Sequence, residues 1–209
     1  MRPLEEQVRE ALDAGITMLQ LREKYLSEED FLREALSIRK LTERYHVPLI
    51  INDSLYVAIN SGADGIHIGQ SDLPAREVRA KLGPDKILGV TAKTVAQALE
   101  AEKAGADYLG SGAVFPSPTK TDAIPMSRET LTAICQSVSI PVVAIGGINA
   151  SNLSTLAGTG IAGAAVISGI FGQPDIGAAV RELRECIHKN HRVIPTVLTI
   201  AGSDSGGGA

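Results

Sequence analysis

The sequence predicts an α/β protein of the (β/α)8 TIM-barrel class, and three features of the chain support this prediction. Short apolar runs alternate with segments of helical periodicity along nearly its whole length. Each run is apolar at consecutive positions, as in parallel strands that helices cover. Glycine recurs where a helix ends and a strand begins, a position that often needs a positive φ. Repeated strand–helix alternation over 209 residues favours one closed barrel over a doubly wound sheet.

Seven apolar runs are the predicted strands, at residues 16–21, 48–52, 65–69, 87–91, 108–112, 141–146 and 164–168. Helical spacing predicts helices over 4–14 and from about residue 28 to 45, with Ser27 as the N-cap of the second. Because the pattern starts with a helix, the barrel is expected to lack its first strand. An eighth apolar run at 193–200 could close the resulting gap, or could begin something else.

Composition excludes several functional classes. Hydrophobic residues make up 44% and charged residues 21%, the balance of a globular domain. The formal charge of −4 argues against a nucleic-acid or membrane-surface binder, which would need a basic face. No apolar run approaches the roughly 18 residues of a membrane span. Cys135 and Cys186 match no metal-binding spacing, so we expect reduced thiols in a cytoplasmic protein.

Residues just past the carboxyl ends of barrel strands are the place to look for chemistry. Gln20, Arg22 and Lys24 alternate after the first run, so an extended backbone points them the same way. Two cations on one side of a strand end suit a phosphate or a pyrophosphate. The alternative is an exposed strand end with ordinary solvated charges.

Two carboxylates follow the next two strands, Asp53 after 48–52 and Asp72 after 65–69. Adjacent strand ends share one rim of the barrel, and a carboxylate pair suits Mg²⁺, which leaves positions for phosphate and water oxygens. Each aspartate could instead cap the following helix. His67 is interpreted as a hydrogen-bonded strand-end histidine rather than a catalyst.

The later strand ends carry groups that suit anions. Thr91 ends the fourth strand, and the loop at 115–122 holds prolines, hydroxyls and Lys120. Glycines at 146–147 and the turn at 168–169 lie after the last strands, where barrels commonly bind a phosphate group. Together these features predict a Mg²⁺-dependent enzyme that joins or splits two phosphorylated small molecules.

The same segments, taken in order, resemble the thiamine-phosphate synthase (thiamine phosphate pyrophosphorylase) family. The matching stretches are 20–24 (Gln-Leu-Arg-Glu-Lys), 51–53 (Ile-Asn-Asp), 62–74, 117–120 (Ser-Pro-Thr-Lys), 143–148 and 166–168. The resemblance implies a transferase that forms a carbon–nitrogen bond. Hydroxymethylpyrimidine diphosphate loses pyrophosphate, and the ring nitrogen of a thiazole phosphate takes the methylene carbon.

The resemblance also implies roles for individual residues. Mg²⁺ would be held by Asp53 and Asp72. Arg22, Lys24 and Lys120 would stabilise the leaving pyrophosphate. The pyrimidine diphosphate would be bound by Gln20, Arg22, Lys24, Asn52, Thr91 and Lys120. Leu21 and Glu23, in the same stretch, would also be substrate-binding residues. The thiazole phosphate would be bound by Ser117, Pro118, Thr119, Gly147, Ile167 and Ser168.

The chain departs from the family pattern at three places. Ser54 stands where the family commonly has Arg, and Thr91 and Lys93 stand where it usually has Ser and His. The family's first strand is absent ahead of the helix at Leu4. We expect a barrel domain over 1–190.

The last residues are also unusual for the family. The segment 197–209 resembles the opening strand and glycine loop of hydroxymethylpyrimidine phosphate kinase, so 191–209 would be the start of a fused kinase domain. The alternative is a flexible glycine-rich tail. We hypothesise that Ile194–Ile200 fills the vacant strand position between the first and last strands.

Two other functional interpretations remain open. A thiazole tautomerase-like relative would share the barrel but would need no diphosphate site. A phosphate-binding barrel could also be inactive because its first strand is missing.

Overall fold

The structure, a computed structural model, describes residues 2–116, 125–190 and 196–201. Its strands are β1 (Met18–Arg22), β2 (Leu49–Asn52), β3 (Gly65–Ile68), β4 (Ile87–Thr91), β5 (Tyr108–Gly112), β6 (Val142–Ile145), β7 (Gly163–Val166) and β8 (Thr196–Ala201). Its helices are α1 (Leu4–Asp13), α2 (Glu28–Tyr45), α3 (Leu55–Asn60), α4 (Ala75–Leu82), α5 (Val95–Lys103), α6 (Arg128–Ser137), η1 (Leu153–Leu156), α7 (Ser168–Phe171) and α8 (Ile176–Asn190).

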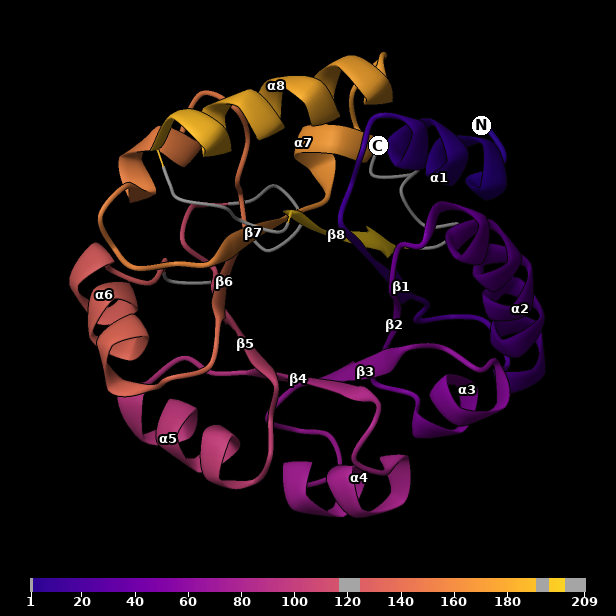
Figure 1. The fold of residues 1–209 in the computed structure, drawn as a ribbon, viewed down its shortest axis with the longest axis horizontal. Helices are drawn as coiled ribbons and strands as arrows, with labels where there is room; N and C mark the ends of the chain where they lie inside the picture. Colours follow the sequence, from indigo (N-terminus) through magenta and orange to yellow (C-terminus); the bar gives the residue numbers. More distant parts are fainter. Residues whose placement is uncertain (1, 117–124, 191–195, 202–209) are drawn as a thin grey trace.

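The strands form a closed barrel of parallel strands in chain order, and the helices lie around it (Figure 1). This arrangement confirms the predicted (β/α)8 class. The first seven strands agree with the predicted runs to within two residues at each end. The predicted helix over 28–45 is α2, and the hydroxyl of Ser27 accepts from the Asp30 amide as its N-cap.

The position between β7 and β1 is filled by β8, the strand nearest the C-terminus (Figure 1). It pairs with β1 from Met18↔Val197 to Arg22↔Ala201, and with β7 from Ala164↔Thr196 to Val166↔Leu198. The hypothesis that this segment fills the vacant place is therefore confirmed for residues 196–200. Ile194 and Pro195 lie outside the described residues. The predicted boundary at residue 190 and the kinase resemblance of the tail stay predictions.

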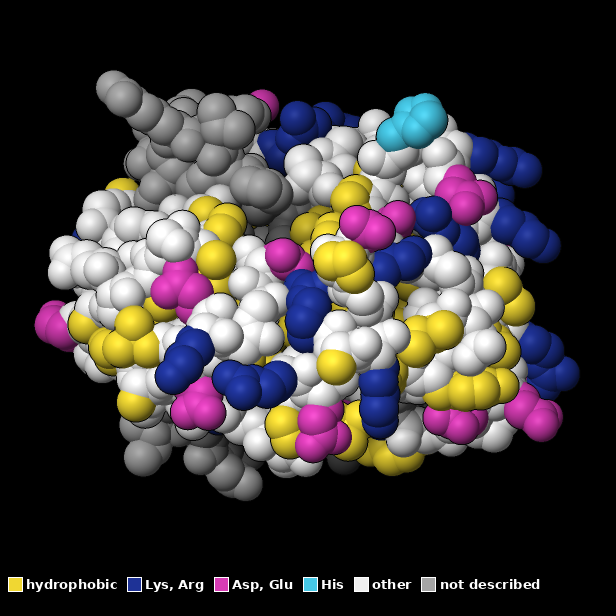
Figure 2. Space-filling view, turned by 60° about the horizontal axis from the view of Figure 1, so that its bottom comes forward, with side chains coloured by type: hydrophobic (Ala, Val, Ile, Leu, Met, Phe, Trp, Pro, Cys, Tyr) yellow, Lys and Arg dark blue, Asp and Glu magenta, His cyan; other side chains and the backbone are white. Residues whose placement is uncertain are grey.

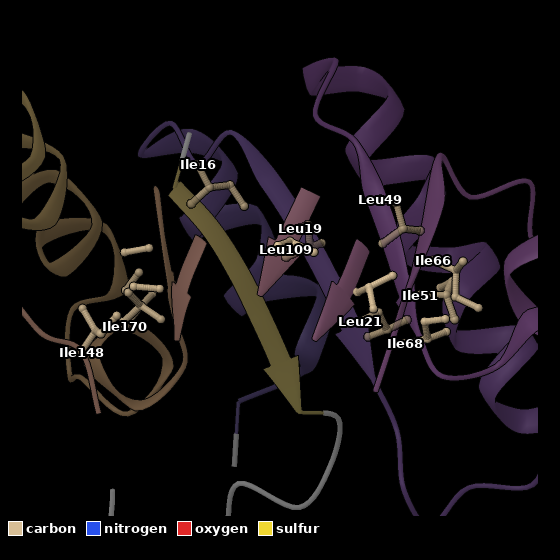
Figure 3. Close-up of a cluster of buried hydrophobic side chains, with 14 of the residues drawn as sticks. Ile16, Leu19, Leu21, Leu49, Ile51, Ile66, Ile68, Leu109, Ile148 and Ile170 are labelled. Atoms are coloured by element: carbon tan, nitrogen blue, oxygen red, sulfur yellow. The ribbon is translucent and has the colours of Figure 1, made fainter. Parts of the chain in front are cut away.

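Two cores follow from the alternation of side chains along the strands. Outward-facing residues pack under the helices, and Figure 3 shows Leu21, Ile51, Ile66 and Ile68 gathered on neighbouring strands. Inward-facing Tyr108, Val143 and Ala165 form a smaller cluster inside the barrel. Alternation thus separates residues that hold the barrel to its helices from residues available to its interior.

Aspartates tie successive strands at the amino-terminal end of the barrel. Asp107 Oδ2 accepts from the Leu88 amide (2.7 Å) and from Arg79 Nη2 (2.5 Å). Asp64 Oδ2 accepts in the same way from the Leu49 amide (2.8 Å) and from an arginine of α2 (2.9 Å). The Gly-Ala-Asp sequence before β3 therefore links β2 to α2, and the same sequence before β5 links β4 to α4.

The surface carries charges of both signs. Figure 2 shows Lys and Arg side chains interspersed with Asp and Glu over the visible face, without a continuous field of either sign. In the described part of the chain, no helix is long and apolar enough to cross a membrane.

Candidate active site

Inward-facing polar residues meet near the carboxyl ends of β1 to β4. Gln20 and Arg22 belong to β1, and Asn52 of β2 is paired with His67 of β3. Thr91 ends β4. The structure thus brings Gln20, Arg22, Asn52 and Thr91 to one rim, as the sequence predicted. Lys24 lies just beyond β1 and is exposed.

A buried hydrogen-bonded chain runs beneath this rim. His67 Nδ1 lies 2.9 Å from the hydroxyl of Tyr108, and His67 Nε2 lies 3.0 Å from Thr91 Oγ1. The side chain of Gln20 also hydrogen-bonds to Tyr108. Burial lowers the pKa of His67 to about 4, so the imidazole is neutral near pH 7. The structure confirms the interpretation of His67 as a hydrogen-bonded strand-end histidine.

Glycines on the inner face make room for these rings. A Cβ at Gly89 would come within 3.0 Å of Tyr108, and a Cβ at Gly110 would lie 2.9 Å from His67 Cε1. A larger residue at either position would push a ring out of the hydrogen-bonded chain. Tyr108 is the member of this chain that the sequence analysis missed. An aromatic at an inward position, facing a strand with glycine at its own inward position, is the signal that could have found it.

Asp53 and Asp72 hydrogen-bond to each other through their side chains. Asp53 adopts a left-handed backbone conformation, with φ of 63°, which aspartate tolerates better than most residues. Burial first, and then the negative charge of Asp72, raises the pKa of Asp53 to about 6, while Arg22 acts in the opposite direction. Two carboxylates and one cation thus share a partly buried site.

Neither aspartate serves as the helix cap that was the alternative interpretation. The N-cap of α3 is Ser54, whose hydroxyl accepts from the Val57 amide. The N-cap position of α4 is Pro74, without a side-chain cap. Asp72 Oδ2 instead accepts from the Gly69 amide at 2.6 Å, which turns its carboxylate back toward the strand end. Ser54, where the family commonly has Arg, therefore has a structural role.

The donor set at Asp53 and Asp72 fits Mg²⁺. The described residues contain no group of three or more His, Cys, Asp or Glu side chains that could hold a metal ion. Mg²⁺ is commonly held by one or two carboxylates and completes its shell with water and substrate phosphate oxygens. A divalent cation would also offset the repulsion that otherwise favours a shared proton between these carboxyls.

The turn after β6 is built from two glycines with positive φ, Gly146 (99°) and Gly147 (65°). A Cβ at Gly147 would lie 2.5 Å from the carbonyl oxygen of Pro116, so only glycine fits there. Asn152 Nδ2 donates to the Gly147 carbonyl at 2.8 Å and holds the turn. The turn therefore lies against the start of the loop that follows β5.

The turn after β7 begins a short helix. Ile167 is the N-cap residue of α7 and Ser168 its first residue. The predicted strand over 164–168 thus ends earlier, at Val166. A helix start leaves backbone N–H groups without intrahelical partners, and these suit an anion.

Some predicted site residues contribute differently or cannot be placed. Leu21 is fully buried on the outer face of β1, so only its backbone is available to the rim (Figure 3). Glu23 hydrogen-bonds to Glu34 of α2, a residue that the sequence analysis did not single out. Ser117, Pro118, Thr119 and Lys120 lie outside the described residues.

A separate groove of about 710 Å³ opens on the outside of the barrel between α4 and α5. Its walls include Leu73, Leu99 and Asp72. Gln20, Arg22, Asn52 and Thr91 do not line it. We therefore place the chemistry at the rim and not in this groove.

A family model described as thiamine monophosphate synthase matches residues 1–170. The chain belongs to the thiamine monophosphate synthase family.

Individual members of the family are similar along nearly the whole chain. A thiamine-phosphate synthase of Ruminiclostridium cellulolyticum is 53% identical over 88% of this chain and 88% of its own length. A second, from Clostridium tetani, is 50% identical over 87% of each chain. The solved structure of thiamine phosphate pyrophosphorylase from Pyrococcus furiosus is 40% identical. It superposes with a TM-score of 0.84 over 91% of this chain and 92% of that one.

Proposed function

We propose that this chain condenses hydroxymethylpyrimidine diphosphate with a thiazole phosphate to give thiamine phosphate and pyrophosphate. The observation that carries the proposal is the meeting of Arg22 with the Asp53–Asp72 pair at one rim of a thiamine monophosphate synthase family barrel. This combination suits a diphosphate bound through a divalent cation and a fixed guanidinium. A tautomerase-like function would have no use for a diphosphate site.

The reaction breaks the bond between the pyrimidine methylene carbon and the bridging oxygen, and the electron pair leaves with pyrophosphate. Arg22, Lys24 and Lys120 would stabilise the negative charge that grows on the leaving group. Mg²⁺, held by Asp53 and Asp72, would supply further stabilisation of that charge when bound. The thiazole nitrogen then forms the new bond to the methylene carbon, so no protein nucleophile is required.

The buried hydrogen-bonded side chains beneath the rim would orient the residues that bind the pyrimidine. Gln20 and Thr91 are each held by a hydrogen bond to the Tyr108–His67 pair. Side chains that are already oriented lose little entropy when a substrate binds. The apolar cluster that contains Tyr108, Val143 and Ala165 lies inside the barrel. Apolar side chains at this position help to exclude water, which would otherwise react with the pyrimidine cation.

The thiazole phosphate would bind opposite the diphosphate, at the turns after β6 and β7. Gly147, Ile167 and Ser168 would contribute there, with Ser117, Pro118 and Thr119 from the preceding loop. Support comes from the tight glycine turn after β6 and from the helix start at Ser168. Both present backbone groups rather than bulky side chains.

The test is pyrophosphate release by the chain supplied with both substrates, with and without Mg²⁺. We expect release that needs both substrates and the metal. Arg22→Ala should lower kcat/KM by at least about a hundredfold, the typical cost of removing one group that stabilises developing charge. The control is Arg33→Ala on α2, where an exposed arginine pairs with Asp30. No release from a folded chain, or equal loss in both variants, would refute the proposal.

Two further proposals concern the cellular setting. Cys135 and Cys186 are free thiols, which supports a cytoplasmic location. The resemblance of 197–209 to the start of a pyrimidine phosphate kinase supports fusion to such a domain in the parent protein. The mass of the native protein, measured from cell extract, would test the fusion.

A further inference from the structure

Glu23 lies between Arg22 and Lys24 in the sequence, but its side chain points away from the side chains of these two cations. Arg22 and Glu23 are consecutive, and Arg22 points inward at the end of β1. The next side chain of an extended segment points to the opposite face. Glu23 accordingly meets Glu34, a half-buried residue of α2, and the two carboxyl groups hydrogen-bond to each other.

A hydrogen bond between two carboxyl groups requires a proton. Glu34 Oε1 is buried and has no hydrogen-bond partner among the described residues. Burial first, and then the charge of Glu23, raises the pKa of Glu34 to about 7. The pair therefore holds one proton at mildly acidic pH and loses it as pH rises through about 7.

Other charged groups near α2 are engaged elsewhere. Asp30 and Arg33, in the preceding turn, form an ion pair with each other. Glu5 of α1 accepts from Ser37 in the following turn of α2. Neither α3 nor β2 contains a charged residue. Arg22 and Lys24 are the cations that flank Glu23, and neither shifts the pKa of Glu34 appreciably.

We propose that Glu34 is a positioning residue for the diphosphate subsite. Its protonated carboxyl donates to Glu23 and holds residues 22–24 against α2, so that Arg22 stays aimed at the rim. This inference rests on the proposed function, because that function assigns Arg22 and Lys24 to the diphosphate.

Loss of the shared proton changes the strand end. Two adjacent carboxylates repel each other, and the Arg22–Lys24 segment then loses its anchor on α2. The site binds a diphosphate less tightly as pH rises through about 7, the pKa of Glu34. Glutamine at this position keeps a donor but cannot titrate.

The experiment compares the wild type with Glu34→Gln and with Glu29→Gln, which changes an exposed glutamate of the same helix. KM for the pyrimidine diphosphate is measured from pH 5.5 to 9 with saturating Mg²⁺. In the wild type and in Glu29→Gln, KM should rise with pH. This rise should be up to about tenfold larger than the rise in Glu34→Gln. Tenfold corresponds to a one-unit displacement of the pair's pKa by binding. Parallel profiles in all three proteins would overturn the proposal.

Two measurements keep the test separate from turnover. The first is the affinity for inorganic pyrophosphate with Mg²⁺, by calorimetry over the same pH range. In one outcome, the wild type releases no product and yet binds pyrophosphate less tightly as pH rises, while Glu34→Gln does not. That result would refute the proposed reaction and leave the positioning role standing.

The second measurement is urea unfolding without ligand. Because the folded state raises the pKa of Glu34 above its ordinary 4.5, the proton favours the folded state. The wild type should therefore lose stability relative to Glu34→Gln as pH rises from about 4.5 through 7. A pH-independent difference would show that no proton is shared and would overturn the proposal.

Discussion

Replacing Gly89 with alanine should lower the free energy of unfolding by more than the addition of one methyl group suggests. A Cβ at this position would lie within 3.0 Å of the Tyr108 ring and its hydroxyl oxygen. Tyr108 is only 6% exposed, and its hydroxyl is hydrogen-bonded to His67 at 2.9 Å. The ring cannot move without breaking that bond.

The magnitude follows from opposing effects. Overpacking a tight interior costs about 1–3 kcal/mol. Leaving buried partners of a displaced hydroxyl unsatisfied costs about 1–3 kcal/mol more. Alanine gains about 0.5–1 kcal/mol over glycine from lower entropy of the unfolded chain, since Gly89 lies in a strand without positive φ. We expect a net loss of about 1–5 kcal/mol in the free energy of unfolding.

The assay is urea denaturation of Gly89→Ala, Tyr108→Ala and the double variant. In the Tyr108→Ala background the ring is gone, so Gly89→Ala should cost less than about 0.5 kcal/mol. Pyrophosphate release should fall in Gly89→Ala because Gln20 and Thr91 lose their common support. Additive costs in the double variant would refute the reasoning, since they would show that the two positions do not touch.

Three other predictions follow from the site and the fold. Asp53→Asn removes one of two carboxylates and should raise the Mg²⁺ concentration needed for half-maximal pyrophosphate release by about ten- to a hundredfold. Asp107→Ala leaves the Leu88 amide and Arg79 without their acceptor and should cost about 1–3 kcal/mol in urea denaturation, with little change in KM. The amides of β8 that hydrogen-bond to β1 or to β7 should be protected in hydrogen exchange, because β8 pairs with β1 over 197–201 and with β7 over 196–198.

Each of these predictions has a result that contradicts it. An unchanged Mg²⁺ requirement in Asp53→Asn would remove this residue from the metal site. Wild-type stability in Asp107→Ala would mean that water replaces the carboxylate without loss. Exchange of the β8 amides at the rate of free coil would show that the barrel is open between β7 and β1.

Local sequence patterns were enough to locate the first seven strands to within two residues at each end. Strand boundaries and the N-cap of α2 depend on residues that are close together in the sequence, so the local pattern of residues predicts them. Alternation along β1 was enough to send Gln20 and Arg22 inward together. The fold class could be inferred from the alternation of strands and helices. The family resemblance could be inferred from motifs at the strand ends, which meet at one rim of a parallel barrel.

Contacts between groups on different strands and helices became visible only in the folded protein. Nothing local in the sequence pairs Glu23 with Glu34 or His67 with Tyr108, because these contacts depend on strand register and helix docking. The closure by β8 could be hypothesised from the sequence, because an apolar run and a vacant strand position were both visible there, but its register against β1 and β7 came only from the structure. The raised pKa of Glu34 and the lowered pKa of His67 arise mainly from burial, which exists only once distant segments have packed.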